Sequence, residues 1–426
     1  MLPYDTCLAD LISFLHSSPT AFHAAANAAA LLTKQGFVQL HEQENWPDLP
    51  AGKYFVLRND SSLIGFTWQG GQTKSGFRMI GAHTDSPGLK VKPNPLRKEQ
   101  NCLQLGVEIY GGALLRPWFD RELSLAGRIF WQDADSRLHS ALLDFQRPVG
   151  IIPNLAIHLN REANKQQEIN TQTDMVPLIG LADDNKVDFQ QLLREQLHRQ
   201  YPEAVPAGFI DHELYFYDAN PPSLVGLNSE LITGARLDNL VSCFAALQAL
   251  LNAAVDENCL IVLYDHEEVG STSAVGAQGP FLRDILERLL PNSEARQTAL
   301  RSSFLISADN AHAVHPNYAA KHDPQHLPYL GKGPVIKFNA NQRYATNAAS
   351  AARFRQLCTL AGVPVQEFVS RSDMACGSTI GPLTAAGIGI ETVDVGIPSL
   401  AMHSIRETAA CIDCWHLCRV LLCFFQ

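Results

Sequence analysis

The feature that most constrains the fold of this chain is a series of short apolar runs, each followed closely by a side chain that can bind a metal ion. The runs, among them Cys259–Tyr264 and Ile388–Val395, have the length of buried β-strands, and helix-like segments such as Ala348–Ala361 separate several of them. This alternation predicts an α/β domain with a central, mostly parallel sheet, whose ligands bind beyond the carboxyl ends of the strands. The side chains that follow the runs are His83, Asp85, Glu267, Glu268, Asp309 and His403.

A further candidate, Asp238, stands at the start of a predicted helix, where aspartate is also a favoured N-cap. The other residues have ordinary alternatives too: a strand-end histidine is commonly structural, Asp309 can belong to a turn, and paired glutamates can be solvated charges. Taken together, histidines and carboxylates suit a pair of divalent ions such as Zn²⁺. Asp85 can hydrogen-bond the ring nitrogen of His83 that faces away from the metal. Of two adjacent glutamates, one can ligate while the other holds a proton.

The middle of the chain has a different sequence pattern, in which prolines and short runs of alternating apolar and polar residues dominate. This pattern indicates a β-rich inserted domain. We therefore predict a catalytic domain made of residues 1–90 and 233–426, interrupted by an insertion at 91–232. The strand-like runs in the insertion include Leu103–Tyr110, Leu125–Trp131 and Leu155–Leu159.

Charge and cysteine usage narrow the class of protein. Lys and Arg number 33 against 43 Asp and Glu, so the net charge of −10 argues against nucleic acid or an anionic membrane as partner. The chain starts without the basic region of a secretory signal, so its ten cysteines are expected to be reduced thiols of a cytoplasmic protein. Cys411 and Cys414 match C-x-x-C, but Cys418 continues their helical spacing into an apolar tail, which favours core cysteines over a metal or redox site.

Several unusual blocks stand in order along the chain: Gly81–Pro87, Gly234–Asn239, Asp265–Ser271, Ser307–Pro316, Gly333–Asn339, Gly377–Pro382 and Ala401–Glu407. They resemble the M18 metallopeptidases, the aspartyl aminopeptidases, and most of all their bacterial branch. The resemblance runs in order from about residue 8 to the C-terminus. It implies a zinc-exopeptidase-like three-layer α/β domain with an inserted, barrel-like β domain.

The resemblance also implies two divalent metal ions per subunit, with Zn²⁺ expected and Co²⁺ or Mn²⁺ also suited to such donors. Carried over by position, Asp238 would bridge the ions, Asp85 would orient a ligand histidine, and Glu267 would be the general base. Metal ions lower the pKa of a bound water towards neutrality, and Glu267 would take its proton and return it to the leaving amine. The remaining metal ligands would be His83, Glu268, Asp309 and His403.

His158 corresponds to a family histidine that is described either as a metal ligand or as a substrate-site group donated by a neighbouring subunit. It lies in the predicted insertion, far in sequence from the other ligands, so we favour the second role. A structural strand histidine is the remaining alternative.

Recognition of an acidic substrate residue needs a cation in the pocket. Lys337 is the best candidate by its position in the matching block, with His315 and Arg343 as others, and a solvent-facing strand-end lysine as the alternative. Ser378 and Met402 complete the predicted substrate-binding residues.

The leading prediction is a dinuclear metalloaminopeptidase that releases N-terminal Asp or Glu from peptides. The resemblance implies a homo-oligomer, with a dodecamer as the expected form. A second hypothesis keeps the metals but changes the specificity to that of a broad or leucine-type aminopeptidase, or of a deacylase. A third, from another class, is a non-catalytic scaffold shell, which the intact set of candidate ligands disfavours.

Overall fold

The computed structural model describes residues 3–46, 49–70, 76–165, 168–182 and 188–426. The chain divides into two compact units, and the second interrupts the first. Within the described ranges, no helix combines the length and the apolar character needed to cross a membrane. The first unit comprises Met1–Asp85, Pro222–Met402 and Glu407–Gln426, and the second comprises Ser86–Pro221 and His403–Arg406.

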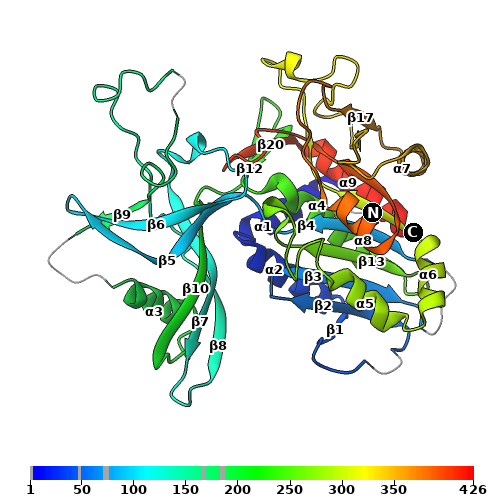
Figure 1. Cartoon of the computed structure of the whole chain (residues 1–426), viewed down its shortest axis with the longest axis horizontal. Helices are drawn as coiled ribbons and strands as arrows, with labels where there is room; N and C mark the ends of the chain where they lie inside the picture. The colour runs from blue at the N-terminus through cyan, green and yellow to red at the C-terminus, as the bar shows by residue number, and fades with distance from the viewer. Residues whose placement is uncertain (1–2, 47–48, 71–75, 166–167, 183–187) are drawn as a thin grey trace. The chain divides into compact units, whose positions relative to one another are not determined.

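A mixed sheet organises the first unit. In the described part of the chain it has nine strands, in the order β1-β2-β3-β13-β4-β14-β18-β16-β17. The four central neighbours β13, β4, β14 and β18 run parallel, and β3 and β16 flank them in antiparallel pairing. Figure 1 labels β2, β3, β13 and β4 of this sheet. The strands are β1 (Val38–Gln39), β2 (Gly52–Arg58), β3 (Ser62–Trp68), β4 (Arg78–His83), β13 (Cys259–Tyr264), β14 (Phe304–Ala308), β16 (Val335–Phe338), β17 (Gln366–Val369) and β18 (Glu391–Gly396).

Helices pack on both faces of this sheet because its central strands are apolar on both sides. Ile80 and Ile261 belong to one core, which includes side chains of α1, α2, α4, α7 and α9. Met79 and Leu260 point the other way, into a core shared with α5, α6 and α8. The helices are α1 (Tyr4–Ser17), α2 (Ala21–Lys34), α4 (Leu237–Leu251), α5 (Phe281–Leu289), α6 (Ser293–Arg301), α7 (Ala348–Ala361), α8 (Ile380–Ile388) and α9 (Cys411–Phe425), with short 3₁₀ turns η2 (Glu267–Val269) and η3 (Ala319–Lys321).

Local sequence explains where these elements begin and end. The predicted helix 348–361 is α7: Asn347 and Ser350 form a capping box at its start, and Gly362 ends it with a left-handed φ of 63°.

A smaller sheet in the same unit has the order β11-β12-β20-β19-β15. Its strands are β11 (Ser223–Val225), β12 (Leu231–Gly234), β15 (Ala311–His312), β19 (Pro398–Leu400) and β20 (Glu407–Ala410).

The second unit is built on an antiparallel sheet with the order β8-β7-β10-β5-β6-β9. Its core contains Trp118, Leu214 and Phe216, together with Leu193 from its helix. The elements are β5 (Gly88–Glu99), β6 (Cys102–Tyr110), η1 (Arg116–Trp118), β7 (Leu123–Gln132), β8 (Leu138–Asp144), β9 (Leu178–Leu181), α3 (Phe189–Gln200) and β10 (Gly208–Asp218).

Two sequence-based expectations about local structure are wrong. Leu155–Leu159, expected as a strand, forms an exposed turn in which the N–H of Leu159 donates to the carbonyl of Ala156. The strand expected from Ile388 starts later, because Ile388 ends α8 and Gly389 terminates that helix with a φ of 71°. Both errors arise from apolar residues that alternate without belonging to a strand.

Candidate metal centre

The parallel strands of the first unit bring their carboxyl ends to one edge of the sheet. The register pairs His83, the last residue of β4, with Tyr264, the last residue of β13. Asp309 directly follows β14, which is parallel to β4 on its other side. The turn that starts at Glu267 lies three residues beyond β13. The edge predicted from the strand pattern therefore carries a histidine and several carboxylates.

His83, Asp238 and Asp309 form the first close group of possible ligands. The Nε2 atom of His83 lies 3.7 Å from Oδ1 of Asp238 and 3.8 Å from Oδ1 of Asp309. All three side chains are buried. Asp238 stands at the beginning of α4, and its backbone N–H donates to Oε2 of Glu407 at 2.8 Å.

Glu267 and Glu268 complete a second close group with His83, in which one ligand atom of each residue lies within 4.8 Å of the others. Asp85 holds the turn η2 that carries both glutamates: the backbone N–H groups of Glu267 and Glu268 donate to its two carboxylate oxygens, each at 3.1 Å. This anchoring role was not predicted from the sequence.

Asp85 also fixes the ring of His83. The Nδ1 atom of His83 lies 3.0 Å from the backbone oxygen of Asp85 and 3.5 Å from its carboxylate oxygen Oδ1. Since a carbonyl oxygen can only accept, Nδ1 carries the proton, and the Nε2 atom is left to face the carboxylates of Asp238 and Asp309. Two carboxylates facing Nε2 call for a positive charge between them, which either a proton on Nε2 or a divalent ion supplies, so these residues fit a bound metal ion.

The electrostatics of the group agree with that conclusion. Burial, followed by the negative charge of neighbouring carboxylates, raises the pKa of Asp238 and Glu268 well above their ordinary values. Burial raises the pKa of Glu267 to about 7, with help from Asp309 and against the opposing charge of His83. A concentration of carboxylates that resist ionisation together is a favourable site for a divalent cation.

Lys337 adjoins this cluster from β16. Its Nζ atom lies 3.6 Å from Oδ2 of Asp309, donates to the backbone oxygen of Asn310 at 3.1 Å, and sits 5.2 Å from the ring centroid of Tyr344. Burial alone would raise the pKa of Asp309, but Lys337 and His83 outweigh it and lower that pKa. Lys337 is 2% exposed, so the alternative of a solvent-facing lysine is wrong.

The other predicted substrate residues of the first unit are less buried. The half-buried ring of His315 packs against Tyr318, with centroids 4.9 Å apart. The exposed Ser378 donates through Oγ to the backbone oxygen of Arg343 at 3.2 Å, and Met402 is half-buried. Among the residues the structure describes, His315 is absent from the close ligand groups.

Two predicted histidines belong to the second unit. His158 is exposed, in the turn that replaces the expected strand. His403 has a left-handed φ of 66°, and its Nδ1 atom donates to the backbone oxygen of Gly112 at 3.1 Å. The Nε2 atom of His403 thus has the acceptor form that a metal ligand requires.

Glu407 and Tyr344 are supporting residues that sequence reasoning missed. Glu407 is buried at the start of β20 and binds the N–H of Asp238, and Tyr344 lies beside Lys337. Glu407 could have been found, because it is the one charged residue in a strand of otherwise small residues, Glu407–Ala410. Tyr344 lies in a loop, where the periodicity of the sequence carries no information.

A buried histidine–carboxylate cluster at the carboxyl edge of a parallel sheet defines the class as a protein able to hold a metal ion there. The family model described as "Aminopeptidase I zinc metalloprotease (M18)" matches residues 14–425. The chain belongs to the M18 family and is a zinc aminopeptidase, as the resemblance of its sequence blocks indicated.

Curated relatives and solved structures agree with this assignment. The "Probable M18 family aminopeptidase 2" of Pseudomonas entomophila is 54% identical over 424 residues, which cover 99% of this chain and 98% of the relative. The structure of the Ape4 and Nbr1 complex contains a chain with a TM-score of 0.95 and 38% identity, covering 99% of this chain and 86% of that one. The S. cerevisiae mApe1 dodecamer gives a TM-score of 0.85 at 28% identity, covering 99% and 97%. These neighbours share the mixed α/β sheets of the fold.

Proposed function

We propose that this chain is a dinuclear metalloaminopeptidase that releases N-terminal Asp or Glu from peptides. The observation that carries the acidic specificity is Lys337, a buried cation whose Nζ atom lies 3.6 Å from the candidate ligand Asp309. A cation beside the metal group can bind an acidic side chain while the substrate amine and carbonyl lie at the reacting edge. His315, Arg343, Ser378 and Met402 are proposed to line the same substrate site.

The proposed metal ligands combine both close groups with histidines that the family pattern adds. Asp238 would bridge two ions, which we expect to be Zn²⁺, with Co²⁺ or Mn²⁺ also accepted. When bound, such ions polarise the scissile carbonyl and lower the pKa of a water. The other ligands would be His83, Glu268, Asp309 and His403, with His158 as the alternative candidate.

Glu267 is the proposed general base. Its pKa of about 7 lets the carboxylate accept a proton near neutral pH and the acid return one to the leaving amine. The contact between its backbone N–H and Asp85 holds the turn in place, so the carboxylate does not need to be ordered at each turnover. Asp85 is thus proposed as a positioning residue for both Glu267 and His83.

We further propose that the chain assembles into a homo-oligomer, with a dodecamer as the expected form. The turn around His158 supports this, because Leu155, Ile157 and Leu159 are 57%, 48% and 75% exposed there. An apolar patch of this kind is typical of a protein interface. His158 would then reach the active site of a neighbouring subunit. The predicted insertion at 91–232, described as barrel-like, would mediate this assembly.

The remaining proposals concern the fold and the cellular compartment. The catalytic domain would be 1–90 and 233–426 with a three-layer arrangement, which the two cores on opposite faces of the sheet support. A cytoplasmic location is supported by ten cysteines that are all free.

A matched panel of Asp-, Glu-, Leu- and Lys-anilide substrates tests the function, with the purified protein assayed before and after chelation and with Zn²⁺, Co²⁺ or Mn²⁺ restored. We expect turnover confined to Asp and Glu, lost on chelation and recovered with metal. A preference for Leu would keep the metal centre and overturn the acidic specificity. Inactivity on every substrate with every metal would favour the scaffold hypothesis.

A further inference from the structure

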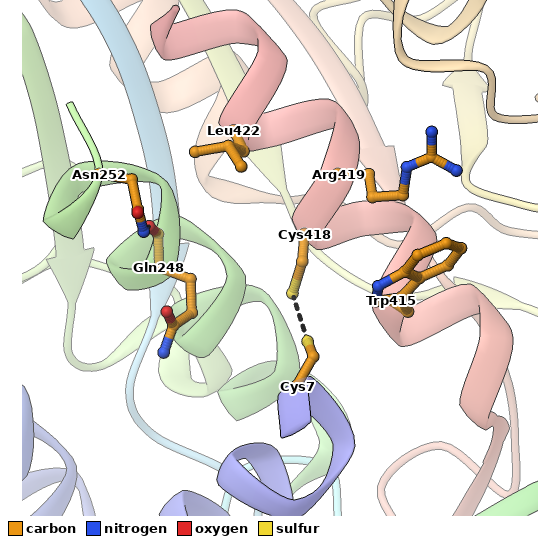
Figure 2. A pocket seen from close by; sticks show the side chains of 7 residues that line it. All are labelled: Cys7, Gln248, Asn252, Trp415, Cys418, Arg419 and Leu422. Carbon is orange, nitrogen blue, oxygen red and sulfur yellow. Dashed lines mark hydrogen bonds between the residues drawn. The ribbon is translucent and has the colours of Figure 1, made fainter. Parts of the chain in front are cut away.

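Cys7 and Cys418 form a thiol pair that joins the first and last helices of the first unit. Cys7 lies in α1 and Cys418 in α9, 411 positions apart in the sequence, yet their Sγ atoms are 3.7 Å apart. Figure 2 shows the two sulfur atoms pointing at each other between the helices. Neither thiol is in a disulfide, and the Sγ–H of Cys7 donates a hydrogen bond to Sγ of Cys418.

A pocket lies beside the two sulfur atoms. It is lined by both cysteines, by Gln248 and Asn252 of α4, and by Trp415 of α9 (Figure 2). The cavity is small, about 20 Å³, which is room for roughly one water-sized molecule at a time. Cys7 and Cys418 are only 2% and 9% exposed, so the pocket is a route by which a small reagent, and not a bulky one, can approach them.

The two thiols are not equivalent. Cys7 is the fourth residue of α1 and lies in its first turn, where the positive end of the helix dipole favours a thiolate. The hydrogen bond with Cys418 lowers the pKa of Cys7, against the opposing effects of burial and Asp10. The same hydrogen bond, together with burial, raises the pKa of Cys418 well above its ordinary value.

Other cysteines near the pair lack these properties. Cys414, one turn before Cys418 on the same helix, is buried, and burial and neighbouring charge raise its pKa well above the ordinary value. Burial likewise raises the pKa of Cys411. Neither of them lines the pocket. The geometry therefore singles out one nucleophilic thiol and one partner.

We propose that Cys7 and Cys418 are an oxidative modification site, at which hydrogen peroxide converts the two thiols into a disulfide that joins α1 to α9. The Cys7 thiolate attacks one peroxide oxygen, the O–O bond breaks, and hydroxide leaves, so that Cys7 becomes a sulfenic acid. Cys418 then attacks the Cys7 sulfur, and the hydroxyl group leaves as water with the Cys418 proton. Two thiols lose two electrons, and one peroxide becomes two waters.

The disulfide would connect the ends of the first unit. A disulfide bond of about 2.05 Å requires the two sulfur atoms to approach by roughly 1.6 Å in total, which side-chain rotation with small helix shifts can supply. Closing a loop of this length restricts the unfolded chain strongly, so oxidation should stabilise the folded unit. This consequence is independent of the metal centre and of the peptidase activity proposed above.

The test treats the reduced, metal-loaded protein with hydrogen peroxide, blocks the remaining thiols by alkylation, and maps the peptides by mass spectrometry. We expect a linked Cys7–Cys418 peptide pair, about 2 Da lighter than the two reduced peptides because two hydrogens are lost. The melting temperature should rise with peroxide and return after dithiothreitol. Oxidised glutathione, which is much larger, should form the link far more slowly than peroxide at equal concentration.

The variants Cys7→Ser and Cys418→Ser should lose both the linked peptide and the rise in melting temperature, whereas Cys414→Ser should keep both. The peptide map of the wild-type protein decides the question even where a variant folds poorly. A thiol at Cys7 that stays fully alkylatable after peroxide, or a link from Cys7 to Cys414 or Cys411 instead, would overturn the proposal. None of these readouts depends on peptide hydrolysis, so failure here and failure of the proposed function are separate results.

Discussion

The Nζ atom of Lys337 lies 3.6 Å from Oδ2 of Asp309, and both side chains are buried. The lysine therefore has two possible effects that sequence alone did not separate. It lowers the pKa of Asp309, which keeps a candidate metal ligand ionised, and it places a cation at the edge of the metal group. A substrate with an acidic first residue would share this cation with Asp309.

Replacing Lys337 by Met should therefore change specificity more than it changes turnover of neutral substrates. We expect kcat/KM for Glu- and Asp-anilides to fall by about 10- to 100-fold relative to Leu-anilide, because a buried charge partner is worth a few kcal/mol. Lys332→Met is the matched control, since Lys332 is exposed five residues earlier in the chain. An unchanged ratio of Glu to Leu turnover in Lys337→Met, with normal metal content, would show that the lysine serves only Asp309.

The Glu267→Gln variant separates proton transfer from metal binding. Glutamine keeps the size of the side chain and the backbone N–H contact with Asp85, but it cannot carry a proton. We expect kcat to fall by roughly 100-fold or more, the usual scale for loss of a general base. Metal content, measured by mass spectrometry of the purified protein, should remain close to normal. The control Glu294→Gln changes an exposed residue of α6 and should be silent. Activity near the wild-type level in Glu267→Gln would remove that residue from the base role.

Asp85 should matter for metal affinity although it belongs to neither close ligand group. Replacing it by Ala removes the acceptor of two backbone N–H groups, at Glu267 and Glu268, and frees the turn that carries both glutamates. We expect metal affinity to fall by about 10- to 100-fold, as is typical for groups that orient ligands. Asp85→Asn keeps one acceptor and should lie between the wild type and Asp85→Ala in a chelator competition assay.

Asp135→Ala, in an exposed turn of the second unit, provides the control for Asp85. Equal metal affinity in Asp85→Ala and in the wild type would mean that η2 keeps its place without the carboxylate.

Prediction from the sequence was most accurate for the segments that are fully buried in the structure. The apolar run Cys259–Tyr264 is β13 without any change of bounds, and Ala348–Ala361 is α7. Such segments are decided by hydrophobic period and capping, both of which are local. Leu155–Leu159 has the same alternation but lies exposed, so the burial that would have made it a strand depends on partners that a local pattern does not contain.

The candidate site shows a similar division. We predicted that His83 and Asp309 would lie close together, because parallel strands end at the same edge of a sheet. In the structure, Nε2 of His83 lies 3.8 Å from Oδ1 of Asp309. Two other features could not be predicted, because they depend on loop conformation and on packing between segments remote in sequence. Asp85 binds two backbone N–H groups, and Lys337 is buried. The chemical roles of these residues stay predictions until the variants above are measured.

His158 offers a test of active-site sharing that needs no structure of the assembly. If it serves the neighbouring subunit, oligomers that mix His158→Ala with Glu267→Gln contain some sites with both residues intact. Random mixing of equal amounts would restore about a quarter of the wild-type sites in a symmetric ring or shell. Co-expression with two affinity tags, followed by tandem purification and assay, measures the recovery. If both residues act within one subunit, every site lacks one of them and the mixture stays inactive.

Two glycines of α8 should respond in opposite directions to the same substitution. A Cβ atom on Gly381 would lie 2.3 Å from Oδ1 of Asp394, whose carboxylate is fully buried and accepts hydrogen bonds from Thr379 and Ala345. Gly381→Ala must displace that network, and we expect it to lower the free energy of unfolding by about 1–3 kcal/mol. Gly387 is exposed near the end of the same helix, and an added methyl carbon there would have no neighbouring atom of the described residues within 4 Å. Gly387→Ala should raise the free energy of unfolding by about 0.5–1 kcal/mol, since alanine favours the helix. Urea unfolding of both variants measures the difference. Equal effects on the free energy of unfolding would mean that the hydrogen bonds around Asp394 rearrange without a loss of stability.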